Sequence, residues 1–255
     1  DAIKRGEKIK EEVIPELPDD DDDDDFDDDQ HEGADGGEAA GRESIVLALR
    51  IDRAVDVAQG DGVEIPVRTD HEFVTAFEPN IDRLGVDQWA YGVSAVEYTT
   101  FDYGHFGVFP LQADPSRPNG GAPQWRDLSD EGPAGLARLR LPPEMFAEID
   151  AIESNPALII FHPRGLGVPG AYFTASGYDR ETGVASNTEL WDEDAFSIVE
   201  VFNESSFAEN LDSTVADWFS FMSRGKRIAV TGSSDSHQVM DGSAVGYPRT
   251  CVITG

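Results

Sequence analysis

The chain has 255 residues, which is enough for one large α/β domain with a sizeable buried core. It carries 51 acidic and 19 basic side chains, a formal net charge of −32. A surface of this sign repels phosphate backbones and anionic lipid headgroups, which argues against general nucleic-acid binding. No apolar run approaches the ~18 residues that span a bilayer, so we expect no membrane span.

The N-terminal part of the chain is the most acidic. Residues 1–40 hold 18 acidic and 4 basic side chains, and residues 19–29 are Asp apart from Phe26. Self-repulsion and the lack of apolar side chains predict that residues 1–44 form a largely disordered, low-complexity insertion or tail. A calcium-binding loop is the alternative, but the run lacks the spaced ligands, central Gly and terminal Glu of an EF-hand loop. Residues 45–255 are the expected folded domain.

Helical and strand-like patterns alternate through the rest of the chain. Helical periodicity occurs at residues 44–59, 143–153 and 213–223. Short apolar strands are expected at residues 63–67, 91–98, 106–111, 157–161, 197–202 and 227–230. The Pro- and Gly-rich residues 114–133 and the segment 165–194 are expected to be irregular. Apolar strands separated by helices favour parallel βα units, and therefore the α/β class, over a sandwich.

Cysteine and serine chemistry is poorly supported. The single cysteine, Cys251, allows no disulfide framework and no Cys-based zinc site, and its strand-like context predicts that it is buried. Ser233 and Ser234 lie near acidic and histidine side chains, but the sequence has no Gly-x-Ser-x-Gly elbow. The acidity and the scarcity of thiols weakly favour a cell-envelope or secreted location over the cytoplasm.

Four of the five histidines lie beside strand ends. His71, His162 and His237 follow predicted strands within a few residues, and His105 lies in a turn between two strands. Because the loops after parallel strands open on one face of a barrel, residues far apart in the sequence converge there. A single His at a strand end is more often a surface or core residue, but four together favour a site. His31 lies in the acidic segment and is given no role.

Carboxylates share these positions. Asp70, Glu97 and Asp235 lie close to the four histidines in the sequence. Several ionised groups at one barrel opening would be energetically costly without a counter-charge. Divalent metal ions remove that cost, and this mixture of nitrogen and oxygen ligands suits Zn, Mn or Fe. Asp235-x-His237 is the sharpest local pattern, because alternate residues of an extended segment can point to one ion or to two neighbouring ions.

Six short motifs follow one another along the chain: Thr69-Asp70-His71, Glu97-x-Thr99-Thr100, Gly104-His105-Phe106, Phe161-His162-Pro163-Arg164, Val199-Glu200-Val201-Phe202-Asn203 and Ser234-Asp235-Ser236-His237. In this order they resemble the PHP (polymerase and histidinol phosphatase) domain superfamily, in its metallohydrolase and phosphoesterase branch. The resemblance covers residues 45–250. It implies a distorted (β/α)7 barrel of the metal-dependent hydrolase type, holding two or three divalent metal ions.

The resemblance also implies roles for individual ligands. His71, Asp235 and His237 resemble ligands of one ion, and His105 and His162 resemble ligands of a second. Glu97 resembles the carboxylate that bridges the two ions. Asp70 is expected to orient His71 rather than to bind metal.

Catalytic and substrate-binding roles are expected for a few further residues. Asp235 and His237 are expected to act in catalysis together with Arg164. Arg164 and Arg249 are candidate phosphate clamps, because a guanidinium can pair two oxygens at once. A surface ion pair is the alternative for each arginine. Asn203 is a candidate substrate-orienting residue, with a turn after the strand as the alternative.

One part of the family pattern is missing. The family begins with a strand that bears His-x-His, and no His-x-His occurs in this sequence. The barrel is therefore expected to lack its first strand or to be truncated there. Both ends of the chain look cut, so we expect the motif to lie upstream of Asp1. The alternative is a chain that has lost the motif and is a weak or inactive enzyme.

The leading functional hypothesis is hydrolysis of a small-molecule phosphate ester by a metal-bound hydroxide. Hydrolysis of a carboxylic or carbamate ester by the same metal site is the first alternative, because metals polarise a carbonyl as readily as a phosphoryl group. A non-catalytic metal-binding domain is the second alternative.

Overall fold

A computed structural model of the protein describes residues 62–131, 137–165, 170–203, 207–237 and 245–253. All of them belong to one compact unit, Gly41–Gly255. The expected acidic segment 1–44 with His31, and the expected helix at 44–59, lie outside the described residues. Within the described ranges, no helix combines the length and the apolarity that crossing a bilayer requires.

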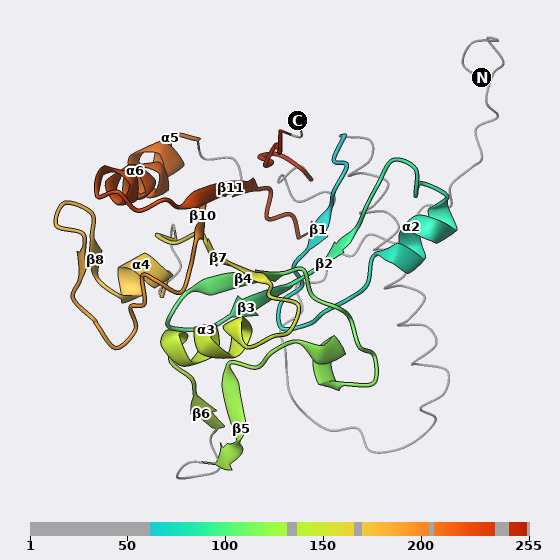
Figure 1. Ribbon diagram of the computed structural model, residues 1–255, viewed down its shortest axis with the longest axis horizontal. Helices are drawn as coiled ribbons and strands as arrows, with labels where there is room; N and C mark the ends of the chain where they lie inside the picture. Colours follow the sequence, from blue (N-terminus) through green and yellow to red (C-terminus); the bar gives the residue numbers. More distant parts are fainter. Residues whose placement is uncertain (1–61, 132–136, 166–169, 204–206, 238–244, 254–255) are drawn as a thin grey trace, which may run out of the picture. The chain divides into compact units, whose positions relative to one another are not determined.

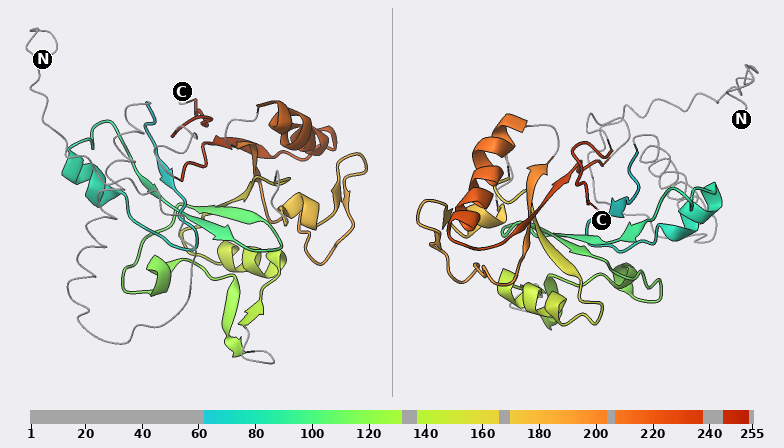
Figure 2. Two further views of the ribbon diagram at one scale, coloured as in Figure 1. Left: turned by 180° about the vertical axis from the view of Figure 1, so that it is seen from behind. Right: turned by 45° about the horizontal axis from the view of Figure 1, so that its top comes forward.

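A five-stranded mixed sheet forms the centre of the fold, with the strand order β11-β10-β7-β4-β3 (Figure 1). The strands are β3 (Val96–Thr99), β4 (His105–Phe109), β7 (Ala157–Phe161), β10 (Ile198–Asn203) and β11 (Ala229–Ser233). β7, β10 and β11 run parallel to one another, whereas β4 is antiparallel to both β3 and β7. Figure 2 shows the same strands from two further sides.

A further segment lies beside β3. β1 (Val67–Arg68) pairs in parallel with β2 (Val93–Ser94). Beyond this pair the same two segments stay together, because a parallel bridge joins His71 to Glu97. The backbone N–H of Glu97 donates to the carbonyl of Asp70 at 3.0 Å. The end of the β1 segment therefore lies next to β3 at the position of Glu97.

The expected (β/α)7 barrel is wrong. The described strands form an open mixed sheet, in which β11 is not paired with β1. The physical reason lies in the short connection between β3 and β4, which consists of residues 100–104 only. A parallel return needs a crossover of about a dozen residues or more, so the chain can only turn back antiparallel here.

One small hairpin begins in the segment 114–133 and another lies within the segment 165–194, both of which were expected to be irregular. β5 (Arg126–Glu131) pairs with β6 (Ala137–Leu139), and β8 (Tyr178–Asp179) pairs with β9 (Val184–Ala185), both antiparallel. Cys251, which was expected in the core, is exposed.

Helices flank the sheet at several places. They are α2 (Glu78–Leu84), the 3-10 helix η2 (Pro118–Gly121), α3 (Pro142–Asp150), α4 (Tyr172–Ala175), α5 (Phe207–Asn210), the π-helical turn η4 (Leu211–Val215) and α6 (Ala216–Ser223). α3 begins with two prolines, whose fixed φ suits a first helical turn. The Glu144 carboxylate accepts the backbone N–H of Leu141 at 2.9 Å and so caps this helix.

Apolar side chains from α3 and α6 complete the core. Phe146 of α3 packs edge-to-face on Phe106 of β4, with ring centroids 5.0 Å apart. Phe221 of α6 is fully buried and stacks on Tyr178 at 5.0 Å. Trp218 of α6 also donates to the Ile228 carbonyl at 3.0 Å, just before β11. Each fully buried Phe contributes roughly 1.5–3 kcal/mol by burial alone, so these contacts fix the helices on the strands that carry the site.

Candidate metal centre

The candidate ligands stand at neighbouring strand ends. Glu97 lies in β3, and Thr99, two residues later, pairs across the antiparallel ladder with His105 of β4. His105 in turn pairs with Phe161 of β7, and His162 follows directly. Because residues two apart on a strand share a face, Glu97 and His105 become diagonal neighbours on that face.

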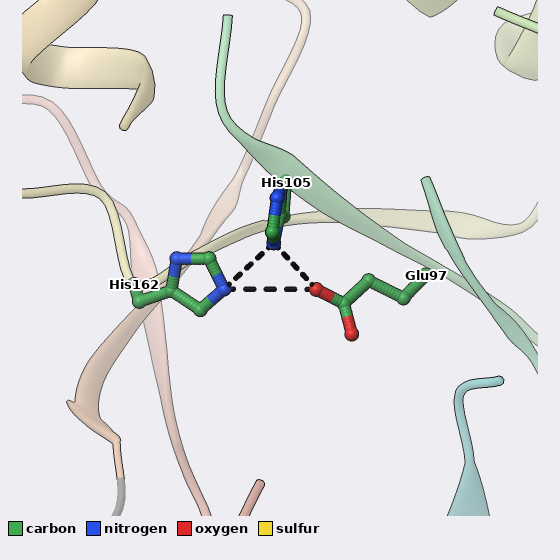
Figure 3. Close-up of side chains that lie close together, drawn as sticks. All are labelled: Glu97, His105 and His162. Atoms are coloured by element: carbon green, nitrogen blue, oxygen red, sulfur yellow. Dashed lines mark hydrogen bonds and ion pairs between the residues drawn. The ribbon is translucent and has the colours of Figure 1, made fainter. Parts of the chain in front are cut away.

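Glu97, His105 and His162 form a compact cluster, which we call the inner triad (Figure 3). The Glu97 Oε1 atom lies 2.8 Å from His105 Nδ1 and 3.6 Å from His162 Nε2. The two imidazole nitrogens lie 3.1 Å from each other. One donor atom from each residue thus lies within 4.8 Å of the other two, and a single metal ion could be held among them.

The inner triad is shielded from solvent. Only 6% of the Glu97 side chain is exposed, and the side chains of His105 and His162 are also largely covered. Burial raises the pKa of the Glu97 carboxyl, but hydrogen bonds from His105 and His162 and the attraction of His71 outweigh burial and lower that pKa to about 2. Burial lowers the pKa of His162, but the Glu97 hydrogen bond and nearby carboxylates outweigh it, so the net pKa is raised. The Glu97 carboxylate is therefore ionised at neutral pH and available as a hard oxygen ligand.

His71, Asp235 and His237 lie beside the inner triad and form what we call the outer group. The imidazoles of His71 and His237 stack with centroids 5.4 Å apart and an interplanar angle of 19°. His237 Nε2 lies 3.4 Å from Asp235 Oδ1. The side chains of His71 and His237 are about half exposed, so the outer group is the solvent-accessible side of the centre.

Glu97 connects the two groups. Its Oε1 atom faces His105 and His162, while its Oε2 atom lies 3.6 Å from His71 Nδ1. The two oxygens of one carboxylate are thus divided between the inner triad and the outer group. All six ligands expected from the sequence belong to one connected cluster.

Two of these ligands have unusual backbone conformations. His162 has a φ of 24° and Asp235 a φ of 47°, in the region that non-glycine residues rarely occupy. Such conformations cost about 1–3 kcal/mol each and persist where the surrounding structure holds them. They redirect the chain where it leaves β7 and β11.

Thr99, not Asp70, is the partner of His71. The Thr99 hydroxyl lies 2.5 Å from His71 Nδ1, whereas the Asp70 carboxylate pairs with Arg68 Nε at 2.7 Å. The backbone N–H of Thr99 also donates to the Glu72 carboxylate at 2.7 Å. Sequence reasoning missed this role, although the Glu97-x-Thr99 spacing places Thr99 on the same face as Glu97.

A buried carboxylate that sequence reasoning left without a role lies behind the centre. Glu200 of β10 accepts the backbone N–H of His162 at 2.6 Å and the side-chain amide of Asn203 at 3.1 Å. Burial and, to a smaller extent, the nearby Asp235 carboxylate outweigh the lowering effects of His162 and Asn203 and raise its pKa to about 8. Asn203, expected to orient substrate, is placed by the structure between Glu200 and Asp235.

The two candidate phosphate clamps lie in different surroundings. The Arg164 guanidinium donates to both oxygens of the buried Asp217 carboxylate, at 2.7 and 2.9 Å, and to the Tyr178 carbonyl at 2.9 Å. These contacts hold Arg164 against α6 rather than in the ligand cluster. Arg249 is exposed, and its Nε donates to the Gly246 carbonyl at 2.6 Å.

Comparisons with known proteins do not assign the chain to a family. No protein-family model matches the chain, and no curated protein matches it. Among solved structures, the crystal structure of PsfC from Pseudomonas syringae PB-5123 is similar with a TM-score of 0.45 and 15% identity, over 78% of this chain and 71% of that one. A similarity this low carries no argument about fold or function. The assignment of the site therefore rests on its own residues.

Proposed function

We propose that the protein is a metal-dependent hydrolase whose centre is built on the inner triad, and that it acts on a small-molecule phosphate ester. The observation that carries the proposal is the shared orientation of one buried carboxylate and two imidazoles toward a common point. Carboxylate and imidazole donor atoms that converge in this way are the ligands that divalent metal ions take in proteins.

The donor set fits a first-row divalent ion. Two imidazole nitrogens and a carboxylate oxygen suit Zn, Mn or Fe better than Ca or Mg, which prefer all-oxygen sites. In the outer group, His71 lies 3.6 Å from the second Glu97 oxygen, and His237 stacks on His71 and lies beside Asp235. In the proposal, His71, Asp235 and His237 would hold a second ion, with Glu97 as a ligand shared by both sites.

Bound divalent ions would supply Lewis acidity, polarising the ester and lowering the pKa of a water molecule. The chain itself does two things in this proposal. The inner triad lies on the side that is shielded from water, and the outer group, with Asp235 and His237 as the expected catalytic residues, lies on the side that the substrate can reach. Arg249 remains a candidate substrate contact, whereas Arg164 has no part because Asp217 engages its guanidinium.

A phosphate ester is preferred to a carboxylic or carbamate ester because the six motifs resemble the phosphoesterase branch of the PHP superfamily. The acidic chain by itself would repel an anionic substrate, and bound cations would offset that repulsion at the site. The relationship to the PHP superfamily remains a prediction from the six motifs. A site that binds metal without turnover is the result expected if the missing His-x-His is essential.

The test compares metal content and turnover in the full chain. We expect the wild-type protein, loaded with Mn²⁺, Zn²⁺ or Fe²⁺, to retain at least one ion after gel filtration and to hydrolyse p-nitrophenyl phosphate. Glu97→Gln should abolish both, because the amide removes the charge and one oxygen donor. Glu148→Gln is the matched control, because Glu148 pairs with Arg140 away from the centre.

Two results would count against the proposal. Turnover of p-nitrophenyl acetate without turnover of p-nitrophenyl phosphate would show that the substrate is a carboxylic or carbamate ester and not a phosphate ester. Retention of metal by the Glu97→Gln protein at the wild-type level would show that the inner triad is not the metal centre.

A further inference from the structure

We propose that Glu200 is a positioning residue, which acts directly on His162 and through Asn203 on Asp235 to hold both ligands in place. The inference rests on the proposed metal centre. It explains the positions of two metal ligands by contacts of a residue that is not itself a ligand. Nothing in the six expected ligands explains how two strained backbone positions are held.

Glu200 stands at the right place for this role. It lies in β10, between β7, which His162 follows directly, and β11, which leads to Asp235. Its side chain is 2% exposed. A carboxylate is costly at such a position unless all its oxygens are hydrogen-bonded, and an apolar residue would fill the same space at no such cost. Packing alone does not require a carboxyl group here, and its hydrogen bonds point to a different role.

The first contact of Glu200 is with the strained residue His162. Glu200 Oε2 accepts the backbone N–H of His162 at 2.6 Å, where the backbone has a φ of 24°. A hydrogen bond from a strained peptide N–H to a buried carboxyl oxygen offsets part of the strain and fixes the direction of the following side chain. The His162 imidazole is thereby directed toward Glu97 and His105.

The second contact reaches Asp235 through Asn203. The Asn203 amide donates to Glu200 Oε2 and to Asp235 Oδ2, both at 3.1 Å. This leaves Asp235 Oδ1 directed toward His237 at 3.4 Å. Because one amide holds both carboxylates, a change at Glu200 is transmitted to the outer group.

The remaining oxygen of Glu200 is also engaged. The Ser233 hydroxyl contacts Oε1 from the last residue of β11. Both oxygens of Glu200 are therefore hydrogen-bonded to protein groups. Glu200 thus connects the ends of β7 and β11 and does not act as a metal ligand.

The experiment measures Co²⁺ binding to the full chain, because Co²⁺ reports ligand geometry in its visible spectrum. The variants are Glu200→Gln and Asn203→Ala. Thr214→Val is the matched control, since it removes a buried hydrogen bond to the Val201 carbonyl of β10 without contact to a ligand. The free energy of unfolding of each protein is measured in EDTA.

We expect both site variants to bind Co²⁺ roughly 10–100-fold more weakly and with an altered spectrum, as is typical when a group that orients a ligand is removed. The control should be less stable but should keep the wild-type affinity and spectrum. Unchanged affinity and spectrum in a folded Glu200→Gln protein would overturn the inference. If that variant does not fold, unchanged Co²⁺ binding by Asn203→Ala overturns it instead.

Failure of the proposed function gives a different result. A wild-type chain that binds Co²⁺ but hydrolyses neither ester leaves the positioning role to be judged by the same variants. A wild-type chain that binds no Co²⁺ overturns both proposals.

Discussion

The two oxygens of Glu97 face different environments, because Oε1 faces the buried inner triad and Oε2 faces the solvent-exposed outer group. The inner triad is largely covered, whereas about half of each imidazole in the outer group is exposed. Electrostatic interactions are stronger where water is excluded, so an ion in the inner triad should be held more tightly than one in the outer group. We therefore expect the loss of a residue that orients an outer ligand to affect the weaker of two binding steps.

Thr99→Val tests this expectation. The substitution keeps the shape of the side chain but removes the hydroxyl that lies 2.5 Å from His71 Nδ1. When Thr99 accepts the Nδ1 hydrogen, Nε2 of His71 keeps its lone pair for an ion. We expect the weaker of two binding steps in a metal titration to lose about tenfold in affinity, and the tighter step to be unchanged.

Thr99→Ser is the control for that titration, because it restores the hydroxyl and should restore the affinity. Equal loss in both binding steps, or no loss in either, would contradict the assignment of Thr99 to the outer group.

Ligands could be predicted from the sequence more readily than their partners. The ligands are rare residue types at strand ends, so their pattern is visible in one sequence. Thr99 and Glu200 are recognised only when the strand register is known, because each acts on a residue at least 28 positions away. The engagement of Arg164 by Asp217 depends on where α6 packs, and no local pattern encodes that.

At the level of elements, a buried ion cluster connects α6 to two loops. Asp217 of α6 is fully buried and pairs with Arg164, which follows β7, and with Arg180, which follows β8, at 2.7 and 3.1 Å. The cluster therefore joins a helix to the loop that begins at His162.

Asp217→Ala should destabilise the protein strongly. The substitution leaves two guanidinium groups without their counter-charge, and breaking such a cluster costs about 3 kcal/mol or more. We expect a loss of that size in the free energy of unfolding, measured by urea denaturation in EDTA. Asp212→Ala, an exposed position in η4, is the control and should change stability by no more than ~0.5 kcal/mol. A loss below about 1 kcal/mol for Asp217→Ala would show that the cluster is not stabilising.

The positions of several elements could be predicted from hydrophobic periodicity. The direction of a strand could not, because it depends on the length of the connection before it. The strand expected at residues 157–161 is confirmed as β7, and the helix expected at 213–223 is confirmed in part, because α6 begins at Ala216 after a π-helical turn. The expected arrangement in parallel βα units is wrong at β4, which runs antiparallel to both of its neighbours. Apolar runs look alike in both directions, so only the five-residue connection at 100–104 reveals the reversal.

For the whole molecule, charge is the dominant general property. A net charge of −32 on 255 residues opposes compaction through self-repulsion. Salt shortens the Debye length from about 30 Å at 0.01 M to about 3 Å at 1 M, which weakens this repulsion.

We therefore expect the thermal midpoint of the metal-free protein to rise by several degrees between low and high NaCl, measured by calorimetry in EDTA. KCl at the same ionic strength should give the same shift, because screening depends on charge rather than on ion identity. A falling midpoint, or shifts that differ between the two salts, would contradict self-repulsion as the cause.

The stacked imidazoles of His71 and His237 have a consequence for the order of folding. One follows the β1 segment and the other follows β11, so the pair joins nearly the two ends of the described chain. Contacts between such distant positions carry a large loop-closure cost and form late. A chain still emerging from the ribosome would complete Glu97, His105 and His162 first, and full ion uptake would wait until the final strand had been synthesised and docked.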